Sequence, residues 1–262
     1  MSASDVMLGT LGLLIVAAAP HGFAAASDQG SGATRLACRM APPGARIVLA
    51  ELYSSEGCDS CPPAERRFGA FNPGLELVPV VWHVDYFDSL GWVDRYALPA
   101  SSQRQKALVA AGGVPAVVTP QVFVDGLAFP AWRDERALRS RLLRQAAQTP
   151  TVALVLQGLA RDGDHLRFEL RAQAAPAAPP IQLQAVLLEG GLVSPVSQGE
   201  NRGVTLHHEH VVRAVAGPVA GAGPWRAQLA LPKPTPAELA VVVWAQDETG
   251  RTLNASWARC TL

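Results

Sequence analysis

The sequence lacks net charge. Its 262 residues contain 22 Lys and Arg against 22 Asp and Glu, so the formal charge at pH 7 is zero. A neutral chain without a basic patch produces no field that would attract a polyanion. We therefore expect no nucleic-acid partner and no binding to an anionic membrane surface.

Long apolar runs are also lacking near the N-terminus. The run Val6–Ala19 is shorter than the roughly 20 residues that a transmembrane helix needs. The small residues Ala24–Ala26 are typical of a signal-peptide cleavage site, although no Lys or Arg precedes the apolar run. We predict a signal peptide over 1–26 and a linker over 27–44. The mature protein is then periplasmic or secreted in a bacterium, with no stable membrane anchor.

Cysteine is scarce, with four residues that allow three pairings: Cys38, Cys58, Cys61 and Cys260. Cys58 and Cys61 are close enough in sequence to bridge each other. Exported proteins seldom keep stray thiols, so we predict a structural disulfide between Cys38 and Cys260. In the chain-entropy model a loop of that length adds about 4 to 5 kcal/mol of stability. Two buried free thiols are the alternative.

The pattern of apolar residues differs between the two halves of the chain. Strand-like runs over 46–55 and 75–86 alternate with helix-like segments, and an amphipathic helix is expected over 131–148. This alternation predicts an α/β domain over 45–149. Alternating and β-branched runs then predict a smaller antiparallel, sandwich-like β domain over 150–262.

The Cys-x-x-Cys motif lies between a predicted buried strand and a predicted helix that begins with two prolines. The first N–H groups of a helix are unpaired and carry partial positive charge. A thiolate of Cys58 at that place is stabilised, and the pKa of such thiols falls from about 8.5 toward about 7 or lower. Cys58 would attack and Cys61 would resolve the mixed disulfide. Asp59 opposes the thiolate, so we expect a less oxidising couple than one with a neutral or basic spacer.

A second motif, "TPQVFVDG", begins at Thr119 and Pro120. In thioredoxin-type folds a cis-proline stands beside the dithiol, and the residue before it offers backbone groups to a substrate peptide. The motif resembles the glutaredoxin signature at that place, and we predict a cis bond before Pro120. The glycine pair with which glutaredoxins help to bind glutathione is absent, because "LAFPAWRDE" follows the motif.

Four segments together carry a closer resemblance: "VLAELYSSEGCDSCPPAE", "VVWHVDYFDSLGWVDRYALPASSQRQ", "TPQVFVDG" and "GENRGVTLHHEHVVRA". The chain resembles the exported, thioredoxin-like domain-of-unknown-function family 1223 from the first predicted strand to near the C-terminus. The resemblance implies a thioredoxin-like fold for 45–149 and a Cys-x-x-Cys pair at Cys58 and Cys61. The expected fold class is therefore an α/β thioredoxin-like domain followed by a smaller antiparallel β domain.

Several other residues are candidates for the site. Glu51, on the strand before the motif, could take the proton of Cys61, or it could be a surface or salt-bridged residue. Tyr86 and Trp92 could line a peptide-binding surface or pack their own loop.

Two segments that contain histidine are candidates for a metal site. His83 and Asp85 share one face of a strand, where His83 could complete a metal site with Cys58 and Cys61. A hydrogen-bonded pair that fixes the following loop is the preferred interpretation. The "HHEH" stretch 207–210 offers only two converging ligands and is interpreted as an exposed strand.

The sequence thus favours an exported thiol–disulfide oxidoreductase or redox-dependent folding factor. Cys58 attacks, Cys61 resolves, and the backbone of Thr119 and Pro120 aligns the partner chain. The expected partners are protein thiols or disulfides and a redox partner, and no cofactor is required. Two alternatives stay open: a copper or zinc carrier that uses Cys58, Cys61 and His83, and a binding module with a static disulfide.

Overall fold

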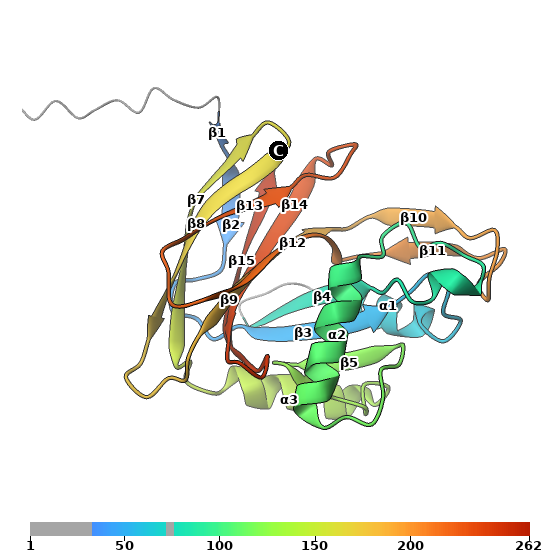
Figure 1. The fold of residues 1–262 in the computed structure, drawn as a ribbon, viewed down its shortest axis with the longest axis horizontal. Helices are drawn as coiled ribbons and strands as arrows, with labels where there is room; N and C mark the ends of the chain where they lie inside the picture. The colour runs from blue at the N-terminus through green and yellow to red at the C-terminus, as the bar shows by residue number, and fades with distance from the viewer. Residues whose placement is uncertain (1–32, 72–75) are drawn as a thin grey trace, which may run out of the picture. The chain divides into compact units, whose positions relative to one another are not determined.

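Two β-sheets and a short hairpin form the framework of the protein (Figure 1). The computed structural model describes residues 33–71 and 76–262. The predicted signal peptide, 1–26, lies outside these residues, as do residues 27–32 of the predicted linker. The described residues belong to one compact unit, Gly32–Leu262.

Within the described ranges, the larger sheet is mixed and has nine strands. In spatial order they are β2 (Ala37–Met40), β15 (Thr252–Thr261), β14 (Glu238–Gln246), β9 (Gln182–Glu189), β12 (Val211–Ala220), β4 (Leu77–His83), β3 (Val48–Ser54), β5 (Gln121–Val124) and β6 (Leu127–Ala128). The second sheet contains β1 (Thr34–Arg35), β7 (Val152–Asp162), β8 (His165–Ala174) and β13 (Trp225–Ala230). The hairpin consists of β10 (Leu192–Pro195) and β11 (Thr205–His208), and the helical segments are α1 (Pro62–Gly69), the 3₁₀ helix η1 (Asp88–Leu90), α2 (Pro99–Gly112) and α3 (Glu135–Ala146).

The expected fold class, an α/β thioredoxin-like domain followed by a smaller antiparallel β domain, is wrong. Strands account for 43% of the described residues and helices for 16%. The strands β3 to β6 of the first half belong to the same large sheet as β9, β12, β14 and β15 of the second half, because β12 pairs in parallel with β4 at Val211 and Val81. Periodicity indicates the type of each element, but it does not reveal which strands pair across a long separation in sequence.

The two faces of β3 are covered by different helices. Side chains alternate along a strand, so Val48, Ala50 and Leu52 pack with buried residues of α1 and α3 on one face. Leu49 and Tyr53 point to the other face and pack with α2, which crosses in front of β3 in Figure 1. We call these the α1 face and the α2 face. All residues of β3 are buried, as expected for a central strand covered on both sides.

The far part of the large sheet packs against the four-stranded sheet. Their shared core is aliphatic and includes Leu154, Leu166, Leu187 and Val241. At the edge of the large sheet, Cys38 of β2 lies opposite Cys260 of β15, and the two residues form the predicted disulfide. The strands of the large sheet that come first and last along the chain, β2 and β15, are thereby joined covalently.

The helix boundaries follow their capping chemistry. The helix α2 begins at Pro99, because the fixed φ of proline suits the first helical position. The helix predicted over 131–148 spans Glu135–Ala146 instead. Its N-cap is Asp134, whose Oδ1 accepts a hydrogen bond from the N–H of Ala137 at 3.0 Å. No helix of the described residues is long and apolar enough to cross a bilayer.

Candidate functional site

The Cys-x-x-Cys motif forms a disulfide at the start of α1. Cys58 and Cys61 are bonded to each other, and Cys61 is the N-cap residue of the helix. Both cysteines are buried, Cys58 with 2% of its surface exposed, whereas Asp59 and Ser60 between them are exposed. The tip of the motif therefore faces solvent while its sulfur atoms lie beneath it.

The first turn of α1 offers few free amide groups. Pro62 and Pro63 have no N–H, and the N–H groups of Ala64 and Glu65 both donate to the carbonyl oxygen of Cys61, at 2.9 and 3.1 Å. The unpaired amides expected at this helix start are thus either missing or already bonded. Any stabilisation of a thiolate by α1 has to come from the helix dipole.

A loop from the second half of the chain holds the motif in place. This loop joins β10 to β11, and Asn201 Nδ2 donates hydrogen bonds to the carbonyl oxygens of Glu56, at 2.8 Å, and Cys58, at 2.9 Å. The neighbouring Glu200 Oε2 accepts a hydrogen bond from the N–H of Asp59 at 3.0 Å. The disulfide is therefore bordered by residues of both halves.

The Thr119–Pro120 peptide bond is cis and stands directly before β5. Gln121, the first residue of β5, lies opposite Tyr53 near the end of β3, from which the chain continues into the motif. The strand register thus brings the Thr119–Pro120 segment to the same end of the sheet as the disulfide.

Tyr86 and Trp92 both make side-chain hydrogen bonds in the loop after β4. Tyr86 donates from its hydroxyl group to Gln105 Oε1 at 3.2 Å, and Gln105 Nε2 donates to the carbonyl oxygen of Val118 at 2.8 Å. Trp92 Nε1 donates to Glu56 Oε2 at 2.7 Å. Both aromatic residues are half-buried, and Trp92 is bonded to the segment that leads into the motif.

Glu51 lies on the α2 face and is not brought to Cys61. Arg104 of α2 binds its carboxylate with two nitrogens at 2.6 and 3.0 Å. Trp82 Nε1 at 3.0 Å and the hydroxyl group of Tyr53 at 3.4 Å complete the set. Because α1 covers the opposite face of β3, Glu51 belongs to a buried ion pair rather than to the surroundings of the disulfide.

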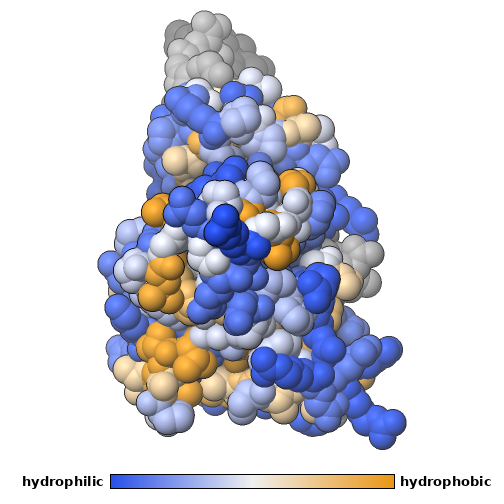
Figure 2. Space-filling model, turned by 90° about the vertical axis from the view of Figure 1, so that its right-hand side faces the viewer, coloured by the Kyte–Doolittle hydropathy of each residue, from blue (hydrophilic) through white to orange (hydrophobic). Residues whose placement is uncertain are grey.

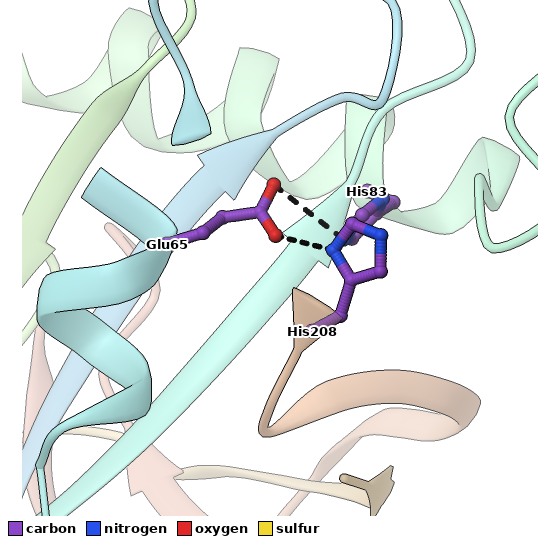
Figure 3. Close-up of side chains that lie close together, drawn as sticks. All are labelled: Glu65, His83 and His208. Carbon is purple, nitrogen blue, oxygen red and sulfur yellow. Dashed lines mark hydrogen bonds and ion pairs between the residues drawn. The ribbon is translucent and has the colours of Figure 1, made fainter. Parts of the chain in front are cut away.

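A polar cluster is buried on the α1 face beside the motif (Figure 3). The carboxylate of Glu65 of α1 faces two adjacent imidazoles: it contacts His208 Nδ1 of β11, and its Oε1 is 3.9 Å from His83 Nε2 of β4. The far side of each imidazole faces another carboxylate. His83 Nδ1 is 2.7 Å from Asp94 Oδ2, and His208 Nε2 is 3.3 Å from Glu56 Oε1.

The electrostatics of this cluster favour charged groups in spite of burial. Burial disfavours the imidazolium form, but Glu56 and Glu65 outweigh it and raise the pKa of His208 to about 9. Asp94 and Glu65 likewise outweigh burial and raise the pKa of His83. Burial alone would raise the pKa of Glu65, yet the two histidines hold it below its usual value.

The structure does not assemble the alternative metal set of Cys58, Cys61 and His83. Cys58 and Cys61 are bonded to each other, and the two nitrogens of His83 face Asp94 and Glu65. Asp85 does not share the histidine's partners, since its Oδ1 accepts a hydrogen bond from the hydroxyl group of Ser102 at 2.5 Å.

Several polar residues near the motif are not among the candidates that the sequence offers: Glu56, Glu65, Asp94, Asn201 and His208. His208 was interpreted as part of an exposed strand, but only 1% of its surface is exposed. Leu206 is buried on the same face of β11, so the alternation along that strand was a usable signal. Glu65 follows Cys61 by four residues, one helical turn, and that spacing was the signal for its position beside the motif.

Two solved structures are similar to this chain. Protein AGR_C_4864 from Agrobacterium tumefaciens has a TM-score of 0.57 at 21% identity, and the match covers 83% of this chain and 95% of that one. HBP35 of Porphyromonas gingivalis has a TM-score of 0.59 at 16% identity, covering 81% of this chain and 74% of that one. At these identities the likeness concerns the fold alone.

A comparison with curated proteins finds no match. The family described as protein of unknown function DUF1223 matches residues 49–246, which include the disulfide motif, the Thr119–Pro120 segment and the loop that carries Asn201. The expected family is thereby confirmed, and the chain belongs to the DUF1223 family.

Proposed function

We propose that the protein is an exported thiol–disulfide oxidoreductase whose redox centre is the Cys58–Cys61 pair. The observation that carries the proposal is the position of this pair. The two cysteines are joined at the start of α1, and the strand register brings the cis Thr119–Pro120 segment to the same end of the sheet. The second disulfide, Cys38–Cys260, joins two edge-region strands and serves stability instead.

The exchange uses only thiols and one disulfide. A thiolate of the partner protein attacks Cys58 Sγ, the Cys58–Cys61 bond breaks, and Cys61 leaves as a thiolate that takes up a proton. A second partner thiolate then attacks the partner's sulfur in the mixed disulfide and releases Cys58. Two electrons pass from the partner dithiol to the Cys pair, and the reverse sequence reduces a partner disulfide.

Access to Cys58 requires a movement of its cover. Its side chain is 2% exposed, and the nearby loop between β10 and β11 is held by Asn201 and Glu200 through three hydrogen bonds. Hydrogen bonds of this kind contribute about 0.5 to 1.5 kcal/mol each, so opening of the loop needs a modest free energy. The exposed Asp59 and Ser60 mark the side from which a partner approaches.

Exposed apolar side chains stand on the loops around this end of the sheet. Leu90 and Val93 lie in the loop after β4 with 57% and 72% of their surfaces exposed, and Val118 precedes Thr119 with 49% exposed. Figure 2 faces the end of the protein where β10, β11 and α1 lie, and it shows hydrophobic patches among hydrophilic residues. Such patches suit an extended, partly apolar segment of a substrate protein that carries the reacting cysteine.

The charges around the motif favour a weakly oxidising couple. The carboxylates of Asp59 and Glu200 lie on the exposed side of Cys58, and α1 presents Pro62 and Pro63 where free amides would otherwise stabilise a thiolate. A reduced form that is little stabilised corresponds to a low reduction potential.

The burial of Cys58 favours a second candidate function, a binding module in which the Cys58–Cys61 bond is static. In that case the disulfide fixes the turn into α1, and the surrounding loops bind a partner without exchange.

One experiment separates the two candidates. The mature chain is equilibrated in redox buffers of graded potential, and the alkylated cysteines are identified by mass spectrometry. Cys38–Cys260 serves as the internal control. The oxidoreductase predicts that Cys58–Cys61 opens above about −300 mV, while structural disulfides lie below that value.

The Cys61→Ser variant supplies the matching trap. Incubated with a disulfide-containing model peptide, it should accumulate a mixed disulfide through Cys58, whereas Cys58→Ser should give none. A Cys58–Cys61 bond that stays closed down to the potential of Cys38–Cys260, together with no trapped peptide, would overturn the redox proposal and leave the binding module.

A further inference from the structure

The buried cluster of Glu65, His83 and His208 takes no part in the thiol–disulfide exchange. Its members come from α1, β4 and β11, and each has less than a tenth of its surface exposed (Figure 3). One potential ligand atom from each of the three residues lies within 4.8 Å of the other two. Two imidazoles and a carboxylate form the donor set typical of zinc sites.

The second nitrogen of each imidazole faces a carboxylate outside the set. His83 Nδ1 is 2.7 Å from Asp94, and His208 Nε2 is 3.3 Å from Glu56. The Asp94 carboxylate is itself fixed by the N–H groups of Glu56 at 2.8 Å and Tyr96 at 2.9 Å. Histidines that bind metals usually donate their other ring N–H to a carboxylate, which orients the ring and increases its basicity.

This arrangement leaves two imidazole nitrogens directed at Glu65. His83 Nε2 is 3.9 Å from Glu65 Oε1 and makes no hydrogen bond, although the residue is fully buried. His208 Nδ1 contacts Glu65 Oε2 directly. A buried ring nitrogen without a partner lowers the stability of the fold by about 1 to 3 kcal/mol. Its presence therefore points to a ligand that binds this nitrogen.

The distances suit a small cation. Zinc binds imidazole nitrogen at about 2.0 to 2.1 Å and carboxylate oxygen at about 2.0 to 2.2 Å, so tetrahedral ligand atoms lie about 3.3 Å apart. His83 Nε2 and Glu65 Oε1 are 3.9 Å apart, so a small approach of these two atoms would let both bind one ion. His208 Nδ1, which contacts Glu65, would have to move away from the carboxylate by a comparable distance.

The charge balance also favours a cation. Among the described residues, no Lys or Arg makes an ion pair with Glu56, Glu65 or Asp94, so the two imidazoles are the only ion-pair partners of these buried carboxylates. A divalent ion bound by neutral imidazoles would neutralise the cluster as well as two imidazolium groups do.

We infer that Glu65, His83 Nε2 and His208 Nδ1 form a binding site for a divalent transition-metal ion of the zinc class, with Asp94 and Glu56 orienting the two histidines. The ion would join α1, β4 and the β10–β11 hairpin. Because this hairpin also carries Asn201 and Glu200, the metal would fix the loop that borders the disulfide.

The test uses the mature chain with both disulfides intact. The protein is treated with a chelator, dialysed against Zn²⁺ alone, and analysed for bound zinc and for its thermal midpoint. We expect one zinc per chain and a higher midpoint. His83→Gln should weaken zinc binding by at least about 100-fold, more than the loss usual for a residue outside the ligand set.

Two controls locate the site. His207→Gln changes an exposed neighbour of His208 on the same strand and should bind zinc like the wild type. The double variant Cys58→Ser/Cys61→Ser should also keep its zinc, because the cysteines are not ligands. Zinc lost in the cysteine variant but retained in His83→Gln would overturn the assignment, as would a wild type that binds none.

A spectroscopic measurement on the wild type covers the case in which His83→Gln does not fold. Co²⁺ in the same site should give the visible bands of a four-coordinate ion with nitrogen and oxygen ligands. An intense near-ultraviolet band from thiolate ligation, or a six-coordinate spectrum like that of free Co²⁺, would contradict the proposed ligands.

Discussion

The two faces of β3 and β4 each carry a buried polar cluster, and the two clusters differ in how completely they are satisfied. On the α2 face, the Glu51 carboxylate is bound by Arg104, Trp82 and Tyr53. The guanidinium of Arg104 also contacts Gln184 and Gln246 and lies 4.7 Å from the ring of Trp244. This cluster is closed, since every charged group has its partner within it.

The cluster on the α1 face is open. His83 Nε2, His208 Nε2 and Glu56 Oε1 are buried without a hydrogen bond. Burial is similar on the two faces, so it does not distinguish a structural ion pair from a site. The difference lies in the unsatisfied atoms, which the fold retains next to the disulfide and the loop that borders it.

The largest expected effect is on the closed cluster. Arg104→Met leaves the Glu51 carboxylate buried without its counter-ion, and breaking such a pair usually costs about 3 to 5 kcal/mol of stability. Urea unfolding measures the loss. The double variant Glu51→Leu/Arg104→Met should recover much of it, because no buried charge is left; a double variant as unstable as the single one would show that the charge is not the cause.

The next effect should appear on the open side. Asp94→Asn removes the carboxylate that orients His83. The affinity of the proposed site for zinc should therefore fall about 10- to 100-fold. Zinc titration against a chelator of known affinity gives the value. Asp59→Asn, an exposed carboxylate in the adjacent turn, is the matched control and should leave zinc affinity unchanged.

A smaller effect concerns the loop that borders the disulfide. Asn201→Ala removes two hydrogen bonds to the motif, worth together about 1 to 3 kcal/mol, so Cys58–Cys61 should be reduced by dithiothreitol about 5- to 150-fold faster. Timed alkylation and mass spectrometry give the rate. Arg202→Ala, an exposed neighbour in the same loop, should react like the wild type. Equal rates in all three proteins would show that the loop does not limit access.

The smallest effect is electrostatic. Asp59→Asn removes one exposed negative charge beside Cys58, and such charges contribute less than about 0.5 kcal/mol. For a two-electron couple this corresponds to a rise of about 10 mV in reduction potential. Equilibration with a glutathione buffer measures the shift, and a fall in potential would contradict the assigned sign.

The sequence predicts the local features of the site well. The disulfide motif at a helix start follows from two cysteines three apart and the prolines after them, because both are properties of adjacent residues. The pairing of Cys38 with Cys260 follows from counting, and the cis bond before Pro120 from a motif whose place in related folds is known.

The long-range features are the ones the sequence does not predict. The pairing of Val211 with Val81 merges the two halves into one sheet, and no local pattern records it. The same pairing brings the β10–β11 hairpin to α1, so the positions of Asn201 and His208 are hidden for the same reason. Glu51 shows the converse error: its nearness to the motif in sequence suggests a role at Cys61, but the alternation of β3 turns it to the other side.

The bond between Cys38 and Cys260 spans 222 residues and joins the edge strand β2 to its neighbour β15. As the polypeptide is made, three of its four cysteines therefore exist long before the partner of the first. Pairing of Cys58 with Cys61 is local, whereas Cys38 cannot form its native disulfide until β15 has been made. A chain truncated before β15 would leave the Cys38 thiol without its native partner.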